Sequence, residues 1–567
     1  MSVLDKPQLA GLAISKGYRR TIRVLNTVST SLMGFSSLIP ERIVLAPTDI
    51  RTADPMLALE FYHGRYVLGG KLVETGGKSP FIIGSQGEAW DRELHAFEWL
   101  RHLSASTDQL SPTHARVLIG DWIDLHRKST SPTVWNLETA SRRLIAWLCN
   151  SVLITSNAEH DFYRQFMRSL GAHVRFLLRE VATAADGMPR LYTYIALAYA
   201  SVCLEGQANS LEHTRTRLGQ VLDHQIWPDG GHISRNPASI VDTLLLLLPL
   251  KHAILASQHE LPAGMMQALD RMVPALRYFR LGDGHLARFN GTGYVEQDLL
   301  AAIMRLDDVA GAPLLDAVHS GYQRMAIGEA VLLMDTGDTP KGELSTEAHA
   351  GCLSFEFSFG PECIITNCGS PRFATSREKP AWRSSAAHST AVLNDSSSCK
   401  FEASGTFGRY LGGQVYSANL KTESARDDGS DYSAISAAHH GYVRDFGIRH
   451  QRNLILDENG QRLSGNDWFS TATKGDLRNT TKDACTLHFH LAPEIKASRT
   501  SDGSSCLLQT RSGEEWIFSA PDFDVSLEES VFFAGIAGSV PTWQIVIRAR
   551  VAKTPEIQWV LQRLQNA

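Results

Sequence analysis

The fold of this chain is indicated by the stretch His349-Ala350-Gly351-Cys352-Leu353-Ser354-Phe355-Glu356-Phe357-Ser358-Phe359. From residue 353 to 359, apolar side chains alternate strictly with serine and glutamate, which is the period of a β-strand with one buried face. One histidine precedes this strand, and a second, His388, precedes the apolar run at residues 390–393. Histidines at these places predict a site at a strand edge that binds a metal or an anionic ligand.

Short β-rich runs continue from about Tyr322 to the end of the chain. They lie at residues 330–334, 353–359, 390–393, 453–456, 486–491, 516–519 and 543–551. Turn clusters such as residues 457–460 separate them, which is typical of strands joined by hairpins. The second half is therefore expected to be an antiparallel β domain.

The first half has a helical pattern from about residue 85 to 310, with apolar residues recurring at intervals of three and four. Its clearest segments are residues 94–103, 139–153, 162–181, 191–204 and 211–222. Asn136, followed by an acidic residue in the first turn, predicts the start of one helix. This half is expected to be an array of helices.

The order of helices first and strands second predicts two domains, because 567 residues exceed one ordinary hydrophobic core. We expect an N-terminal extension over residues 1–54, a helical domain over 55–320 and a β domain over 321–567. A cleft between two such domains is a preferred place for a ligand.

The composition limits the function. A hydrophobic content of 43% and a charged content of 20% are those of a folded soluble protein, and the net charge of −5 provides no basic field for nucleic acid. The eight cysteines form no C-x-x-C pair. The apolar run at residues 244–250 is too short for a membrane span. No export signal is recognised, so a cytoplasmic location is expected, with the periplasm or cell envelope as the alternative.

Two glycine-containing loops of the helical half carry polar side chains that could do chemistry. Residues 227–237 present His232, Arg235 and Asn236, which are types that bind a carboxylate and move a proton. Residues 281–294 contain four glycines, which allow close approach of the backbone to a ligand, and end at Tyr294. The alternative is that both are ordinary connectors between helices.

The β half offers a further set of polar residues. His349 and His388, with Asn367 between them, are either part of a metal site or hydrogen-bonded core residues.

These pieces follow one another in an order that resembles the heparinase II/III-like polysaccharide lyases over about residues 55–565. The resemblance is carried by residues 61–70, 135–147, 229–232, 349–359, 382–390 and 440–450. It implies an incomplete (α/α) toroid followed by a C-terminal antiparallel β-sheet or β-sandwich domain, with a polysaccharide in the cleft between them.

The resemblance also implies β-elimination on a uronic acid, in which positioned donors stabilise the charge that develops on the carboxylate. It gives His232, Arg235 and Asn236 the roles of carboxylate neutralisation or base, and Tyr294 that of general acid or base. Substrate contacts are expected from His285, Arg288, Asn290, Glu347 and Arg383. A structural zinc ion is expected at His349, Asn367 and His388.

The partners expected from this resemblance are an anionic polysaccharide or oligosaccharide and a second copy of the chain in a homodimer. Two other functions stay open. Where relatives commonly carry His-x-His-x-Asp, this chain has Glu347 and Gly351, which favours a glycan-binding protein that has lost turnover. A glycosidase would need two carboxylates roughly 5 to 10 Å apart, for which Asp229 and Asp283 are candidates.

Overall fold

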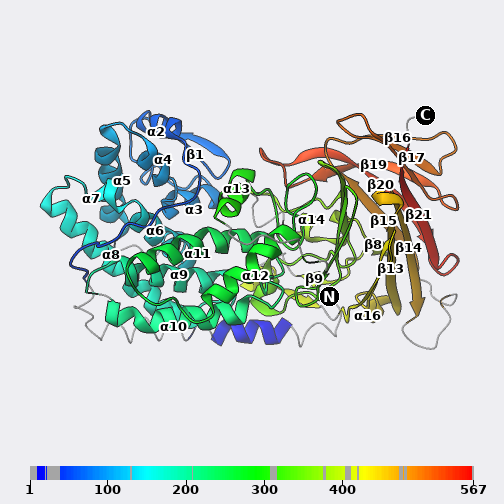
Figure 1. Cartoon of the computed structure of the whole chain (residues 1–567), viewed down its shortest axis with the longest axis horizontal. Coiled ribbons are helices and arrows are strands. Elements are labelled where there is room, and N and C mark those ends of the chain that lie inside the picture. The colour runs from blue at the N-terminus through cyan, green and yellow to red at the C-terminus, as the bar shows by residue number, and fades with distance from the viewer. Residues whose placement is uncertain are drawn as a thin grey trace.

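The computed structural model describes residues 9–18, 21, 39–127, 131–206, 208–306, 314, 316–373, 379–401, 410–417, 420–471, 477 and 482–564. Helices fill the first half of the chain and antiparallel sheets fill the second, and the two halves lie side by side along the long axis of the molecule (Figure 1). The helical half is an incomplete (α/α) toroid, and the second half is a β-sandwich.

The toroid is built from helices of very different length. They are α2 (Pro55–Tyr62), α3 (Glu88–Ala96), α4 (Leu100–Ala105), α5 (Leu110–His126), α6 (Leu137–Cys149), α7 (Ser151–Thr155), α8 (His160–Glu180), α9 (Met188–Cys203), α10 (Ala208–Gln225), α11 (Ala238–Ala256), α12 (Met265–Tyr278) and α13 (Gln297–Arg305), with a hairpin of β1 (Arg65–Leu68) and β2 (Lys71–Glu74) after α2. Asn136 caps α6 as expected, because its Oδ1 accepts a hydrogen bond from the Thr139 N–H at 2.8 Å. Helix α9 packs against α6, α10 and α11.

Two of the expected helices are interrupted. The segment at residues 94–103 is divided because Phe97 adopts a left-handed conformation, with φ of 59°, and so ends α3. Its buried ring stacks on Trp99 with the ring centroids 5.1 Å apart. The segment at residues 139–153 is divided at Asn150 into α6 and α7. Helix propensity continues through both breaks, so the local sequence does not indicate them, and both depend on tertiary packing.

Helix α11 is long and apolar enough, by length and composition, to cross a membrane. In the structure 72% of its 18-residue apolar window is buried inside the fold. It packs against α9, α12 and α13, so its all-round apolar surface is accounted for by a central place in the toroid.

The sandwich consists of two sheets whose described pairings are all antiparallel. The sheet next to the toroid has the order β19 (Val525–Phe532), β20 (Val540–Arg550), β15 (Ala484–Leu491), β7 (Glu362–Thr366), β6 (Phe355–Phe359), β5 (Ala330–Asp335), β4 (Tyr322–Ile327), β3 (Asp316–Ala317), with β8 (Ala391–Leu393) also on β15. The other has the order β11 (Glu423–Asp428), β12 (Ser433–His439), β13 (Ile448–Asp457), β14 (Arg462–Thr471), β21 (Glu556–Arg563), β18 (Glu515–Ser519), β17 (Ser505–Gln509), β16 (Lys496–Arg499). Between them, Phe489 packs on Trp559 with ring centroids 4.7 Å apart.

Smaller elements complete the β half. They are β9 (Lys400–Phe401), β10 (Val415–Ser417), α14 (Lys379–Arg383), α16 (Val443–Phe446) and the 3₁₀ turns at Gly342–Thr346, Ser385–Ala387 and Glu458–Gly460, while a further such turn, Val181–Thr183, follows α8 in the toroid.

The prediction that residues 353–359 bury only one face is wrong, because the polar side chains at 354, 356 and 358 are all 0% exposed. The apolar face of β6 points into the sandwich, where Phe355 stacks on Trp559. The polar face binds the toroid: a Glu356 carboxylate oxygen accepts from the Arg288 N–H at 3.0 Å, and the Ser358 hydroxyl accepts from the Gly282 N–H at 2.9 Å. The alternation therefore marks an interdomain contact instead of a solvent face.

Candidate functional site

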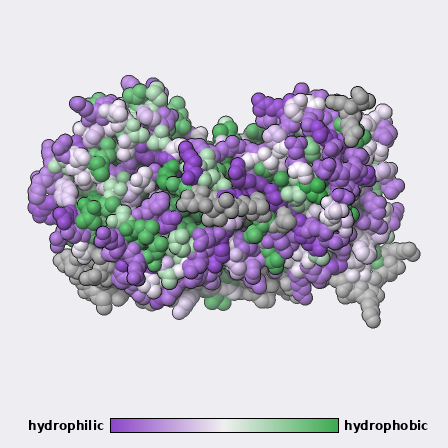
Figure 2. All heavy atoms as spheres, viewed as in Figure 1, coloured by the Kyte–Doolittle hydropathy of each residue, from purple (hydrophilic) through white to green (hydrophobic). Residues whose placement is uncertain are grey.

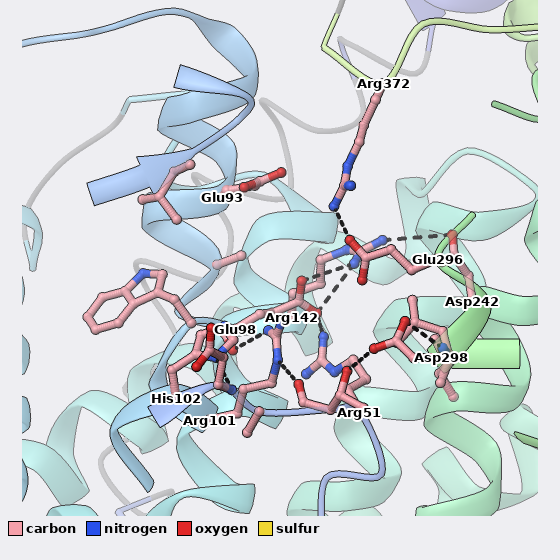
Figure 3. Close-up of a pocket in the computed structure, with 18 of the residues that line it drawn as sticks. Arg51, Glu93, Glu98, Arg101, His102, Arg142, Asp242, Glu296, Asp298 and Arg372 are labelled. Carbon is pink, nitrogen blue, oxygen red and sulfur yellow. Dashed lines mark hydrogen bonds and ion pairs between the residues drawn. The ribbon is translucent and has the colours of Figure 1, made fainter. Parts of the chain in front are cut away.

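A cavity of about 700 Å³ lies where the toroid meets a loop of the β half (Figure 3). The molecule is also visibly hollowed between its two halves (Figure 2). Most of the cavity wall comes from the toroid: the chain at residues 51–57, β1, the α3–α4 region, α6, α9, α11 and the segment at residues 294–299. Arg372 is the lining residue that reaches in from the β half, from the loop after β7.

The floor of the cavity is an ion-pair network centred on Glu98. Arg51 Nη1 lies 2.6 Å from one carboxylate oxygen and Arg142 Nη1 lies 3.3 Å from the other. Although burial alone would raise it, these guanidiniums lower the pKa of Glu98 to about 2. Arg142 also donates to the Tyr192 hydroxyl at 2.6 Å and lies 4.0 Å from Asp242, whose pKa is raised by burial. Fixed charges of both signs therefore face the cavity.

The rim carries more exposed groups. Arg372 donates to a Glu296 carboxylate oxygen at 2.7 Å, and the two side chains are 36% and 34% exposed. Tyr294 is partly exposed, and burial together with the Glu296 charge raises its pKa, so at neutral pH it holds its proton and can donate it. The His285 ring lies 6.1 Å from the Tyr294 ring, centroid to centroid. Burial lowers the pKa of His285, which keeps the ring neutral, and its Nε2 accepts a hydrogen bond from the Gln297 side-chain amide at 3.1 Å.

Next to this rim, the junction of the two halves gathers several of the expected site residues. The Asn236 side-chain oxygen accepts from the Thr292 hydroxyl at 2.8 Å, two residues before Tyr294. Its amide nitrogen lies 3.4 Å from Glu347, whose side chain is exposed. Asn290 donates to Asp335 at 3.2 Å and accepts from the His349 N–H at 3.1 Å. Asn236, Asn290, Glu347 and Tyr294 are thus brought into one region.

His232 is not among the residues that line the cavity. Its ring is 1% exposed, and its nitrogens are engaged by the Ser234 hydroxyl at 2.7 Å and the Gln225 side-chain oxygen at 3.3 Å. Burial lowers its pKa to about 4. The structure gives His232 the surroundings of a neutral, hydrogen-bonded histidine in the wall of the toroid.

The three arginines expected to contact substrate or carboxylate are engaged inside the protein. Arg235 donates to Ser320 O, Gly321 O and Asp338 O and forms a buried ion pair with Asp335. Arg383 donates to Ala348 O, Gly413 O and Ser345 O, and Arg288 pairs with Glu356. Arg235 and Arg288 tie the toroid to the sandwich, and Arg383 ties loops within the β half, so none of them has a free guanidinium facing the cavity.

The expected zinc ligands do not fit a zinc ion. His349 Nδ1 and His388 Nε2 are 2.9 Å apart and hydrogen-bonded to each other, whereas two nitrogens on one tetrahedral zinc would be about 3.4 Å apart. The Asn367 side-chain oxygen accepts from the Ser389 N–H at 3.0 Å, which leaves its buried NH₂ group, a donor, without a partner among the described residues. Within the described part of the chain, no group of three His, Cys, Asp or Glu side chains is arranged to hold a metal.

The glycosidase alternative gains no support from Asp229. Its two carboxylate oxygens accept from the Ser320 N–H and the Ser320 hydroxyl, each at 2.7 Å, so the carboxylate is engaged in positioning β4 beside the toroid. Asp283 accepts from the His285 N–H at 2.9 Å in its own loop.

The sequence did not reveal the cavity floor. Its one contact that the sequence predicts is the ion pair of Glu138 and Arg142, because residues four apart on α6 lie on the same face. The structure has this pair at 3.3 Å. Arg51, Glu98 and Asp242 come from three distant elements, and nothing in their local sequence indicates that they meet. Arg372 lies two residues beyond Ser370 in a loop that had no assigned role.

Comparison with known proteins gives a consistent picture. The family model described as heparinase II/III-like, C-terminal, matches residues 310–560. The chain is 30% identical over 549 residues to FtsZ-localized protein C of Caulobacter vibrioides (strain NA1000 / CB15N), which covers 93% of this chain and 91% of that protein.

Solved structures share the architecture at low sequence identity. Heparinase III aligns with a TM-score of 0.69 at 13% identity, covering 87% of this chain and 80% of that chain. The heparan sulfate lyase HepC from Pedobacter heparinus aligns with a TM-score of 0.58 at 14% identity, covering 97% and 88%. At these identities the likeness shows the fold and does not transfer an activity.

Proposed function

Because this chain belongs to the heparinase II/III-like family, we propose that it binds an acidic saccharide in the cavity at Tyr294 and cleaves it by β-elimination. The observation that carries the proposal is the placement of Tyr294 and Arg372 together at the rim of a cavity that both halves of the molecule line, with the His285 ring 6.1 Å behind the Tyr294 ring, centroid to centroid. A proton donor, a proton acceptor and a cation are the three kinds of group that the reaction on a uronic acid requires.

In the proposed reaction, His285 removes the C5 proton of the uronic acid and Tyr294 protonates the departing O4 oxygen. The directions of their pKa shifts support this division, since His285 is held neutral and Tyr294 is held protonated. Arg372 neutralises the carboxylate together with the Asn236 amide. Arg372 can exchange partners, because its pair with Glu296 is more than a third exposed on both sides and such pairs are worth only about 0–1 kcal/mol.

The proposal is tested by incubating the full chain with heparin, heparan sulfate, alginate and other uronate polymers and recording the ultraviolet absorbance of an unsaturated sugar. Tyr294→Phe removes one hydroxyl and should lower the rate by about 10²-fold or more, since a positioned acid contributes that much. Tyr432→Phe, which removes an exposed hydroxyl on the far β half, is the matched control. No absorbance on any polymer with folded protein refutes the proposal.

A second candidate function is a glycan-binding protein without turnover that acts where FtsZ is localised. It is favoured by the near full-length match to FtsZ-localized protein C and by Glu347, Gly351 and Asn367, which stand where the family resemblance implies metal-ligating side chains. Fluorescent fusions that coincide with FtsZ, together with glycan-array binding and no chain cleavage, would favour it. Formation of an unsaturated product excludes it.

We propose a cytoplasmic location for this protein, which cell fractionation tests.

A further inference from the structure

Where the family resemblance implies a zinc site, this chain holds a line of hydrogen bonds that begins at a serine. The Ser370 hydroxyl lies 3.1 Å from His349 Nε2, His349 Nδ1 lies 2.9 Å from His388 Nε2, and His388 Nδ1 lies 2.7 Å from the Ser384 carbonyl oxygen. The two imidazoles are 4% and 1% exposed, whereas Ser370 is partly exposed. The line therefore runs from a partly exposed serine through two buried imidazoles.

The last acceptor fixes the direction of every bond in this line. A carbonyl oxygen only accepts, so His388 Nδ1 carries a proton and its Nε2, in the neutral ring, accepts from His349 Nδ1–H. His349 Nε2 is then a bare lone pair, and the Ser370 hydroxyl donates to it. Burial lowers the pKa of both rings, that of His388 to about 4, which keeps both neutral. This is the arrangement of a nucleophile, a base and a group that orients the base.

We propose that Ser370 is a nucleophile for acyl transfer, with His349 as its base and His388 as the residue that positions His349, so that the chain hydrolyses a carboxylic ester without a metal. Glycine at 351 permits the arrangement, since a Cβ there would lie 2.7 Å from His388 Cδ2. In addition, the buried NH₂ group of Asn367 has no partner among the described residues and, being a donor, cannot ligate a metal.

The chemistry balances with water as the only co-reactant. Ser370 Oγ forms a bond to the carbonyl carbon of the ester, and its proton passes to His349 Nε2. The bond from that carbon to the alcohol oxygen breaks, and the alcohol leaves with the proton. Water, deprotonated by the same nitrogen, then attacks the acyl-serine, releasing the acid and restoring the hydroxyl.

The position of Ser370 indicates which ester it would meet. Its N–H donates to Thr292 O at 3.0 Å, and it pairs with Gly293, so it lies against the segment that carries Tyr294. Two residues further on, Arg372 lines the cavity. The natural substrate we infer is an O-acyl group on a saccharide held in that cavity, and this choice of acyl donor rests on the proposed function.

The test uses the purified full chain and two probes that β-elimination cannot act on: a fluorophosphonate, read by intact mass and peptide mapping, and p-nitrophenyl acetate. We expect one label per chain at Ser370 and no label in Ser370→Ala. Ser430→Ala, an exposed serine on the far half, is the matched control and should be labelled normally. Ser370→Ala and His349→Gln should each lower the turnover number for the ester by about 10²-fold.

His388 is tested by rescue. His388→Gln keeps a side-chain oxygen able to accept from His349 Nδ1–H and should retain most of the labelling rate, whereas His388→Leu should lose it. If His349→Gln does not fold, as judged by thermal melting, Ser370→Cys should be alkylated by iodoacetamide at least about 10-fold faster than Ser430→Cys. No label on the folded chain, a label that survives Ser370→Ala, equal alkylation rates, or stoichiometric zinc in the purified protein would each overturn the proposal. Failure of these tests leaves the β-elimination proposal untouched, because neither probe reports on it.

Discussion

Replacing Arg235 with methionine should cost stability and not merely activity, because this side chain joins the two halves of the molecule. Its guanidinium donates to the carbonyl oxygens of Ser320, Gly321 and Asp338 at 2.7, 2.9 and 2.9 Å, and it pairs with Asp335. The side chains of the pair are 5% and 4% exposed. The guanidinium also lies over the Tyr322 ring, 4.7 Å from its centroid.

The size of the loss follows from what methionine leaves behind. The Asp335 carboxylate then stays buried. Among the described residues it keeps two hydrogen-bond donors, the Asn290 amide at 3.2 Å and the Gly337 N–H at 3.1 Å. Breaking a buried pair from one side typically costs about 3–5 kcal/mol, since the remaining charge is uncompensated. Arg235→Lys keeps the charge but not the planar guanidinium and should lose about half as much free energy of unfolding.

The assay is urea unfolding of the full chain, followed by tryptophan fluorescence and by hydrogen exchange of residues 316–338. Since a two-domain chain need not unfold in one step, the exchange data identify which transition moves. Arg548→Met is the control: Arg548 pairs with Glu528 on the surface, where its side chain is 59% exposed, and its loss should shift nothing measurable. If Arg235→Met shifts the transition by less than about 1 kcal/mol yet abolishes saccharide binding, Arg235 is a ligand-contacting residue and the reasoning fails.

Three further outcomes are expected. Tyr294→Phe should lower β-elimination by about 10²-fold with an unchanged melting temperature, and an equal rate would remove Tyr294 from the mechanism. The pKa of His388 is about 4 in the fold and higher in the unfolded chain, so its contribution is complete above about pH 6.5 and lost as the pH falls to 4, a change of about 3 kcal/mol. His388→Gln should flatten that slope in pH-dependent unfolding, and an unaltered slope would show that other groups cause it. Gly351→Ala should cost about 1–3 kcal/mol in urea unfolding through its contact with His388, and a neutral result would mean the ring moves freely.

The architecture could be read from the sequence because it depends on local periodicity. The expected strands at residues 330–334, 486–491 and 516–519 correspond to β5, β15 and β18, and the helix over residues 162–181 corresponds to α8. Each of these elements could be predicted because the apolar pattern of its own residues indicates whether it is a strand or a helix. The breaks at Phe97 and Asn150 were missed, because they depend on how a side chain fits against other helices.

The candidate site was harder to read, because residue type does not state whether a polar group faces a ligand or another part of the protein. Arg383 and Arg288 are suitable types for binding an acidic sugar, yet the first donates to three backbone carbonyls and the second pairs with Glu356. Tyr294 lies on the cavity as its loop suggested. The acidic and basic groups of the floor come from elements far apart in the sequence, so only the closed toroid brings them together.

The alternating strand and the glycine-rich loop were separate signals in the sequence, and the structure joins them into one interface. Ser358 and Glu356 on β6 accept hydrogen bonds from the backbone of residues 282 and 288, and a Cβ at Gly282 would collide with the carbonyl oxygen of Gly360. The loop that carries His285 and Tyr294 is therefore held by the sheet through its main chain, which leaves the Tyr294 side chain to line the cavity. Replacing Glu356 or Ser358 with a side chain that cannot accept a hydrogen bond would move the loop. The geometry of the cavity therefore depends on the polar face of β6, which is fully buried.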